Sequence, residues 1–251
     1  MTIDLTDSGN PKILGELKIP GYSTYLHPYD ATHLIGVGYD TKIGQWGGTQ
    51  NGGVKVDLYD VGDVANPKQL STLTLGDAGS SADVLSNPRL FVWSAARHLL
   101  FMPATLMTSA KDAIDIYRNK DAWQGTLALS IDTTNGVKEK ARITHLEVSG
   151  LESKRTEDCK QYTKIETKPM CYKIIGGGEY CTNPSGAYVP PYCYADSPIG
   201  EYFASQIWNF SNDFIVRNLY LDNALITVSN NKIQANDIAK TYEKIGSVEM
   251  K

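Results

Sequence analysis

The sequence contains no apolar run of about 18 residues, so it predicts no transmembrane helix. Its lysines and arginines are not clustered and its net charge is −4, which argues against nucleic acid as a partner. The first residues lack the basic start and apolar stretch of a signal peptide. They enter a predicted strand directly, and we therefore expect Met1 to lie inside a longer parent protein with further blades upstream.

Familiar catalytic motifs are also missing. The sequence has neither a G-x-S-x-G elbow nor an H-E-x-x-H pair, and Gly176–Gly178 is not followed by the Lys-Ser/Thr of a phosphate loop. The four histidines, His27, His33, His98 and His145, are isolated in sequence. We expect each of them to make structural hydrogen bonds, and the sequence favours a non-catalytic protein.

Turn-forming residues and tyrosine are abundant. The chain has 22 Gly, 11 Pro and 15 Tyr among 251 residues, and 41% of its residues are hydrophobic. This composition is typical of a globular protein in which many strands are joined by tight turns.

An internal repeat indicates the architecture. Residues 3–21 (IDLTDSGNPKILGELKIPG) and residues 56–77 (VDLYDVGDVANPKQLSTLTLGD) share an apolar-Asp-Leu-x-Asp start, an Asn-Pro-Lys turn and an alternating strand. Weaker copies begin at Leu129 and Ile233. Each copy predicts two strands joined by a turn, and two further predicted strands precede each later copy.

Four antiparallel strands per unit are typical of a β-propeller blade. The sequence therefore predicts an all-β fold, a partial β-propeller of about three and a half four-stranded blades. The expected divisions are a half blade at 1–21, blades at 22–77, 78–148 and 207–251, and a cysteine-rich insertion at 149–206. Because the opening half blade lacks two strands, we expect apolar residues such as Leu26, Leu34 and Ile35 to lie on an exposed flank.

Several stretches resemble a known family. The strings GELKIPGYSTYLHPYDATHLIGVGYD (15–40) and VDLYDVGDVANPKQLSTLTLGDAGSSADVL (56–85) are similar to secreted archaeal and bacterial proteins with a C-terminal β-propeller domain. LFVWSAARHLLFMPATL (90–106) and WQGTLALSID (123–132) extend the resemblance. It implies a propeller fold and a secreted, extracellular or cell-surface location, and it implies no reaction.

All four cysteines fall in the insertion: Cys159, Cys171, Cys181 and Cys193. An even number in a polar segment predicts two disulfides, since cross-links offset the entropy of ordering a region without its own core. Zinc ligation or free thiols are the alternatives, although the close Cys pairs of a zinc site are absent. Of the three possible connectivities, the pairing of neighbours, Cys159–Cys171 and Cys181–Cys193, is favoured.

Aspartates cluster near predicted turns. Asp57, Asp60 and Asp63 alternate along one strand and its turn, and Asp77 and Asp83 flank a Gly-Ser segment. Carboxylates in loops can bind Ca²⁺, which makes calcium at Asp77 and Asp83 one possibility. The other interpretation, which the residue pattern favours, is that these aspartates accept hydrogen bonds from backbone amides in turns. No other cofactor is indicated.

Aromatic residues crowd the insertion and its end. Tyr and Trp provide large contact areas at low entropic cost and suit interfaces and sugar or peptide recognition. Packing of the insertion onto the propeller is the other use for them and is slightly favoured. The candidates are Tyr172, Tyr180, Tyr188, Tyr192, Tyr194, Tyr202 and Trp208. The sequence Asn209-Phe210-Ser211 matches an N-glycosylation acceptor site.

These features favour a non-catalytic extracellular binding or scaffold module that engages a protein or a cell-surface glycan. The alternative is a metal-assisted hydrolase with Asp and His at one end of the propeller channel. Approach of His27, His98 or His145 to Asp77 or Asp83 would distinguish the two, because propellers host both classes of function.

Overall fold

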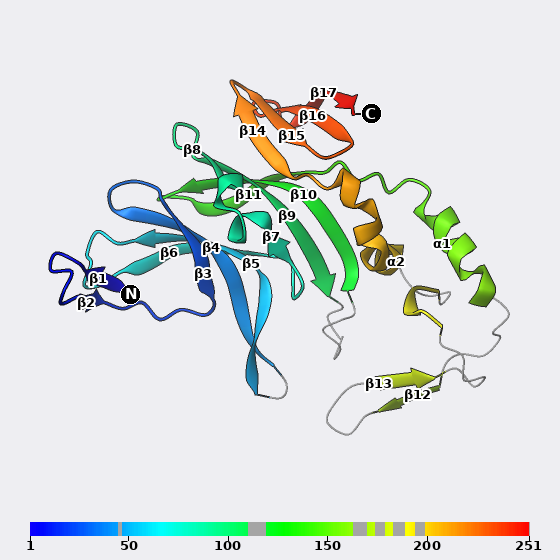
Figure 1. Cartoon of the computed structure of the whole chain (residues 1–251), viewed down its shortest axis with the longest axis horizontal. Helices are drawn as coiled ribbons and strands as arrows, with labels where there is room; N and C mark the ends of the chain where they lie inside the picture. Colours follow the sequence, from blue (N-terminus) through cyan, green and yellow to red (C-terminus); the bar gives the residue numbers. More distant parts are fainter. Residues whose placement is uncertain are drawn as a thin grey trace. The chain divides into compact units, whose positions relative to one another are not determined.

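The computed structural model of the chain describes residues 1–44, 47–109, 119–162, 170–173, 179–182, 189–193 and 199–250 (Figure 1). The chain divides into two compact units. The first unit comprises Met1–Leu106, Gln124–His145 and Asn212–Lys251, and the second comprises Met107–Trp123 and Leu146–Ser211.

The first unit begins with a short hairpin followed by a full antiparallel sheet. The hairpin joins β1 (Thr2–Asp4) to β2 (Lys12–Gly15), and among the described strands these two pair only with each other. The full sheet has the spatial order β3-β4-β5-β6. Its strands are β3 (Tyr22–Pro28), β4 (His33–Gly44), β5 (Gly48–Asp60) and β6 (Lys68–Leu75). Order in space follows order in sequence, as in a propeller blade.

The next sheet has the order β11-β10-β9-β7, and β8 also pairs with β9. The first-strand position is thus divided between two short strands, with two 3-10 turns between them. These elements are β7 (Ser81–Ala82), η1 (Asp83–Leu85), η2 (Pro88–Leu90), β8 (Val92–Ser94), β9 (Leu99–Ser109), β10 (Asn119–Asp132) and β11 (Gly136–Ile143). β9 and β10 extend into the second unit, so they are longer than the strands predicted from the sequence.

The last sheet is a meander in the order β14-β15-β16-β17. Its strands are β14 (Arg217–Leu221), β15 (Ala224–Val228), β16 (Lys232–Asp237) and β17 (Glu243–Glu249). The predicted all-β propeller architecture is confirmed in the mostly β, repeated antiparallel sheets of this unit.

One turn recurs between the third and fourth strand positions of the sheets. In each case an aspartate carboxylate accepts a hydrogen bond from the backbone amide two residues later, at 2.9–3.1 Å. The four aspartates are Asp7, Asp63, Asp132 and Asp237. Asn10 and Asn66 also donate their amides to the carbonyls of Asp7 and Asp63, both at 3.0 Å. The two Asn-Pro pairs therefore lie in equivalent hairpins, as the repeat predicts.

Asp57 does not cap a turn, so the prediction for this residue was wrong. It lies in the middle of β5, between β4 and β6, and is fully buried. Its carboxylate accepts hydrogen bonds from Tyr59 Oη at 2.6 Å and Gln69 Nε2 at 2.7 Å and lies 3.2 Å from Lys55 Nζ. Lys55 also donates to the carbonyl of Pro20 at 2.6 Å. Burial and the hydrogen bond to Asp57 raise the pKa of Tyr59.

A layer of buried polar side chains joins the second and third full sheets beside an apolar cluster. Phe101 on β9 and Leu225 on β15 belong to this cluster. Gln124 donates to the Ile215 carbonyl and accepts from the Ile215 amide, both at 2.9 Å. Thr126 donates to Asn218 Oδ1 at 2.6 Å. Because each buried polar group needs a partner, these bonds fix how one sheet lies on the next.

The second unit contains short helices that the sequence analysis did not anticipate. They are α1 (Leu151–Cys159), η3 (Lys160–Tyr162), η4 (Pro191–Cys193), α2 (Ile199–Gln206) and η5 (Ile207–Asp213), beside the strands β12 (Met170–Lys173) and β13 (Glu179–Thr182). Helix α1 is built from strong helix formers, but its polar sequence, LESKRTEDC, lacks an apolar stripe. Periodicity alone therefore missed it. No helix in the described parts of the chain is long and apolar enough to span a membrane.

The buried Lys55–Asp57 pair gives a stability prediction. Asp57→Ala leaves the Lys55 ammonium buried without its carboxylate, and we expect a loss of about 3–5 kcal/mol in the free energy of unfolding. Denaturant unfolding measures this loss. The control, Asp63→Ala, removes only an exposed turn acceptor and should move the midpoint much less. Equal effects of the two variants would contradict the role assigned to the pair.

Candidate functional site

An open pocket of about 470 Å³ lies within the second unit. It is formed where the end of α1 and the 3-10 turn η3 lie beside η4. Its lining residues are Glu157, Asp158, Lys160, Gln161, Tyr162 and Tyr192. Two tyrosine rings, two carboxylates, an amide and an ammonium group thus border one cavity of a size that suits a small ligand.

A disulfide joins the two sides of this pocket. Cys159 at the end of α1 is bonded to Cys193 at the end of η4, and their Cα atoms are 5.4 Å apart. The neighbouring residues Asp158, Lys160 and Tyr192 line the pocket. The predicted pairing of neighbouring cysteines was therefore wrong. Sequence proximity did not decide the bond, because η4 packs against α1 and α2 and brings Cys193 to Cys159.

A buried tyrosine contacts two residues of the pocket wall. Tyr202 on α2 is fully buried and donates a hydrogen bond to Asp158 Oδ2. Its ring meets that of Tyr192 edge-on, with centroids 5.3 Å apart. Burial, together with the hydrogen bond to Asp158, raises the pKa of Tyr202, which keeps the phenol protonated as a donor. Tyr202 therefore orients both a carboxylate and a ring of the pocket wall.

The remaining aromatic candidates have different positions. Tyr172 and Tyr180 are register partners on β12 and β13. Trp208 on η5 is 64% exposed. Tyr188 and Tyr194 lie outside the described residues. Of the aromatic residues proposed for binding, Tyr192 lines the pocket, and Tyr162, which the sequence analysis did not single out, lies there as well.

The candidate modification and calcium residues lie elsewhere. Asn209 is exposed on η5, and its amide donates to Gln206 Oε1 at 2.5 Å. Asp77 Oδ1 lies 3.8 Å from Lys42 Nζ. Asp83 is half-buried on η1, and this burial raises the pKa of its carboxyl group. Among the described residues, no group of three or more His, Cys, Asp or Glu side chains is arranged to hold a metal ion.

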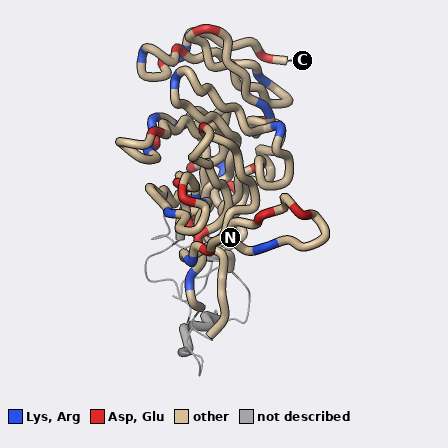
Figure 2. The backbone as a smooth tube through the Cα atoms, turned by 90° about the vertical axis from the view of Figure 1, so that its left-hand side faces the viewer, with Lys and Arg blue, Asp and Glu red and all other residues tan. Residues whose placement is uncertain are grey.

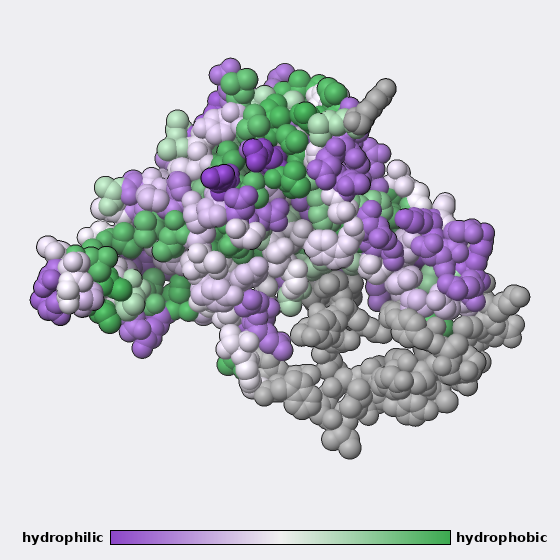
Figure 3. Space-filling model, in the orientation of Figure 1, coloured by the Kyte–Doolittle hydropathy of each residue, from purple (hydrophilic) through white to green (hydrophobic). Residues whose placement is uncertain are grey.

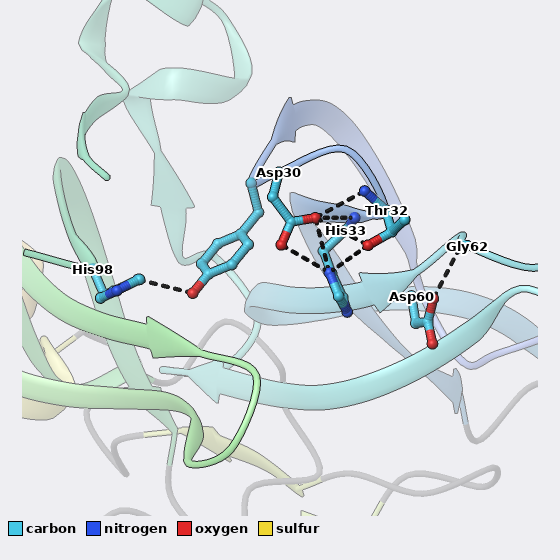
Figure 4. A network of polar contacts seen from close by, with 7 residues as sticks. Asp30, Thr32, His33, Asp60, Gly62 and His98 are labelled. Carbon is cyan, nitrogen blue, oxygen red and sulfur yellow. Dashed lines mark hydrogen bonds and ion pairs between the residues drawn. The ribbon is translucent and has the colours of Figure 1, made fainter. Parts of the chain in front are cut away.

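Three of the histidines belong to an aromatic cluster in the first unit. Tyr29 Oη lies 2.8 Å from Nδ1 of His98, and the Tyr29 ring also contacts Trp93 at 5.6 Å. Figure 4 shows His98 directed toward this contact, and His33 directed toward Asp30, whose carboxylate lies 2.9 Å from His33 Nδ1. The turn between β3 and β4 thereby contacts the β8–β9 hairpin through the Tyr29 ring.

His27 and Phe91 extend this cluster. Their ring centroids are 4.5 Å apart, and His27 Nδ1 lies 3.2 Å from Tyr25 Oη. Burial lowers the pKa of His27, which favours the neutral ring that packs against Phe91. These contacts lie between the first strands of two successive sheets and make the cluster part of the packing between them.

His145 occupies a separate, buried position. Its Nδ1 lies 3.0 Å from Ser229 Oγ and its Nε2 lies 2.8 Å from Thr227 Oγ1. Burial, with smaller effects from Lys232 and Lys244, lowers its pKa to about 4, and Asp213 opposes them. The neutral ring therefore connects the end of β11 to the last sheet. His27, His98 and His145 form their hydrogen bonds with hydroxyl groups. The hydrolase alternative predicts contacts with the carboxylates of Asp77 or Asp83.

Comparisons with known proteins agree with the fold. The family model described as Beta propeller domain matches residues 1–173. An uncharacterized protein of Methanocaldococcus jannaschii is 38% identical over 104 residues, which cover 41% of this chain and 15% of that protein. An uncharacterized protein of Archaeoglobus fulgidus is 38% identical over 102 residues, which cover 41% of this chain and 14% of that protein.

A solved structure, the AfRom2 CNH domain, is 11% identical to this chain with a TM-score of 0.24, and the comparison covers 99% of this chain and 60% of that one. Successive antiparallel meanders with a recurring third hairpin define a β-propeller. The chain belongs to the Beta propeller domain family. It spans about 15% of the length of the curated relatives it matches.

The cysteine arrangement predicts a nested disulfide map. Cys159–Cys193 encloses the hairpin of β12 and β13, where Cys171 and Cys181 are directly opposed in the strand register. We expect peptide mapping of the unreduced protein to recover Cys159 linked to Cys193 and Cys171 linked to Cys181. A peptide that links Cys159 to Cys171 would overturn this map.

His145 predicts a pH dependence of stability. Its folded-state pKa of about 4 lies below the ordinary value of 6.5, so the unfolded chain binds the proton more readily. The contribution of the neutral His145 ring to the free energy of unfolding is fully present above pH 6.5. It is lost at about 1.4 kcal/mol per pH unit as the pH falls toward 4. Urea unfolding across this range measures the slope. His145→Gln should flatten it. An unaltered slope in His145→Gln would refute the assignment.

Proposed function

We propose that this domain is a non-catalytic, extracellular binding module whose ligand is a glycan. The observation that carries the proposal is the pocket in the second unit, where Tyr162 and Tyr192 border a cavity together with Asp158 and Gln161. Tyrosine rings pack against the C–H faces of sugars, and carboxylate and amide oxygens accept hydrogen bonds from sugar hydroxyls. A protein ligand is the other class of partner that such a surface can take.

The construction of the pocket favours binding. The Cys159–Cys193 bond and the Tyr202–Asp158 hydrogen bond hold the pocket wall before any ligand arrives. A wall that is already ordered loses less entropy on association, so more of the contact energy appears as affinity. The disulfide also supports an extracellular location, because such bonds persist in oxidising compartments.

The module is proposed to operate within a longer protein. The two curated relatives are several times longer than the region they share with this chain. The opening hairpin β1–β2 holds two strands of a unit that has four elsewhere. We expect upstream residues of the parent protein to supply the missing strands and further blades, and the propeller to serve as a scaffold that carries the pocket.

A glycan array followed by titration calorimetry tests the binding proposal. We expect Tyr162→Ala to weaken the affinity for the bound glycan about tenfold, which corresponds to the loss of one ring contact of roughly 1.4 kcal/mol. Gln161→Ala should weaken it as well, while Tyr22→Ala, on an exposed residue of the first unit, should leave it unchanged.

Circular dichroism and Cys159–Cys193 peptide mapping confirm that each variant is folded. Absence of binding to every glycan on the array, or equal affinities for the wild type and Tyr162→Ala, would contradict the proposal. A protein captured through the same tyrosines, without any glycan, would replace the glycan by a protein ligand.

A further inference from the structure

The charges that line the pocket in the second unit do not balance. Its lining residues include two carboxylates, Glu157 and Asp158, against one ammonium group, Lys160, which leaves a net charge of −1. Lys160 Nζ donates a hydrogen bond to Glu157 Oε2, so these two charges offset each other. Asp158 belongs to no ion pair among the described residues, and its only printed partner is a neutral phenol. The unbalanced charge of the pocket is therefore that of Asp158.

Asp158 is held in place with one of its two carboxylate oxygens available to a ligand. The buried phenol of Tyr202 donates to Oδ2, and the Cys159–Cys193 disulfide fixes the adjacent residue. No described group donates a hydrogen bond to Asp158 Oδ1. The pocket thus presents an oriented, negatively charged acceptor. A positively charged donor matches such an acceptor best, because hydrogen bonds between charged groups are stronger than those between neutral groups.

The two tyrosine rings of the pocket suit the same kind of ligand group. Tyr162 and Tyr192 are both half-buried, so each leaves part of its ring accessible. The face of an aromatic ring carries partial negative charge and attracts an ammonium group that lies over it. A carboxylate beside aromatic rings therefore favours a cationic amine. The same carboxylate repels an acidic sugar.

The surroundings of the pocket agree with a polar ligand that is not acidic. Figure 3 shows mainly hydrophilic residues over the region where Figure 1 places α1, whose sequence is LESKRTEDC. Figure 2 shows lysines and arginines interspersed with acidic residues along the coloured part of the chain, in place of one continuous basic stretch. The net charge of the whole chain, −4, adds a long-range attraction for cations.

We propose that this pocket selects a ligand that carries a cationic amine, and that Asp158 determines the selectivity. The inference rests on the proposed glycan-binding function and names the ligand as a glycan that contains an amino sugar with a free amine. The ammonium group donates to Asp158 Oδ1 and lies against the tyrosine rings, and sugar hydroxyls bond the amide of Gln161. An N-acetylated sugar lacks the positive charge, so its contact with Asp158 is weaker. A protein lysine offers the ammonium group without the hydroxyls that Gln161 would bind.

Calorimetric titration with a matched pair of oligosaccharides tests this selectivity. The probes are a glucosamine tetramer and its fully N-acetylated counterpart, which differ only at the amine. At a pH where the amine is protonated, we expect the glucosamine tetramer to bind at least about tenfold more tightly. Added salt should weaken this binding and leave that of the N-acetylated tetramer nearly unchanged, because screening acts on the contact between charges.

The variant Asp158→Asn separates the charge of the pocket from its shape. The amide oxygen can still accept the hydrogen bond of Tyr202, so the pocket wall keeps its geometry. We expect the affinity for the glucosamine tetramer to fall about tenfold and that for the N-acetylated tetramer to change less than about twofold. The control, Glu152→Gln, makes the same chemical change on α1 outside the pocket lining and should alter neither affinity. Mapping of the Cys159–Cys193 peptide checks that each variant is folded.

Failure of this inference is distinguishable from failure of the proposed function. Equal affinities of the wild type for the two tetramers, or an Asp158→Asn variant that still prefers the free amine, would overturn the amine selectivity and leave glycan binding intact. Absence of binding to both tetramers and to every glycan on the array would overturn both proposals. A lysine peptide that binds through Asp158 when neither tetramer binds would overturn the assignment to an amino sugar.

Discussion

Stacking of one antiparallel sheet on the next is the constraint on which the first unit depends. A four-stranded sheet has two faces, and at least one of them must be buried against another element for the unit to be stable. Between the second and third full sheets, Phe101 and Leu225 supply the apolar part of the contact. Gln124 and Thr126 supply a polar part in which each buried group needs a specific partner. The apolar contacts drive the stacking, and the polar contacts select one relative position of the sheets.

The repeat could be predicted from the sequence because its signal is local. An aspartate that accepts the amide two residues later, followed by Asn-Pro, determines a hairpin with little help from the rest of the chain. Asp57 belongs to the same repeat, but its environment is determined by tertiary packing and not by a local turn. It is buried beside Lys55 by strands that arrive from elsewhere in the sequence. Nothing in the string VKVDLYD distinguishes a buried aspartate from a turn aspartate, so the polar network could not be predicted.

The candidate site was predictable only in outline. Clustered cysteines and tyrosines directed attention to the insertion, where the pocket lies, but the Cys159–Cys193 bond joins residues 34 positions apart through the packing of η4 on α1 and α2. Among the pocket residues, Asp158 and Tyr162 belong to a polar stretch without an evident motif. One sequence signal could have found Asp158. The residues adjacent to a cysteine share its position in space, so both neighbours of Cys159 are candidates for the wall it cross-links.

The two units are stabilised by different physical means. Sheets in the first unit are ordered by the sheets beside them, through contacts such as Phe101–Tyr220 and Thr126–Asn218. The second unit is built from short helices and a short hairpin, which are too small to be stable by stacking. A cross-link that closes a loop of 34 residues lowers the conformational entropy of the unfolded state, which stabilises the folded state by roughly 3–4 kcal/mol. The pocket therefore owes its rigidity to a covalent bond within its own unit.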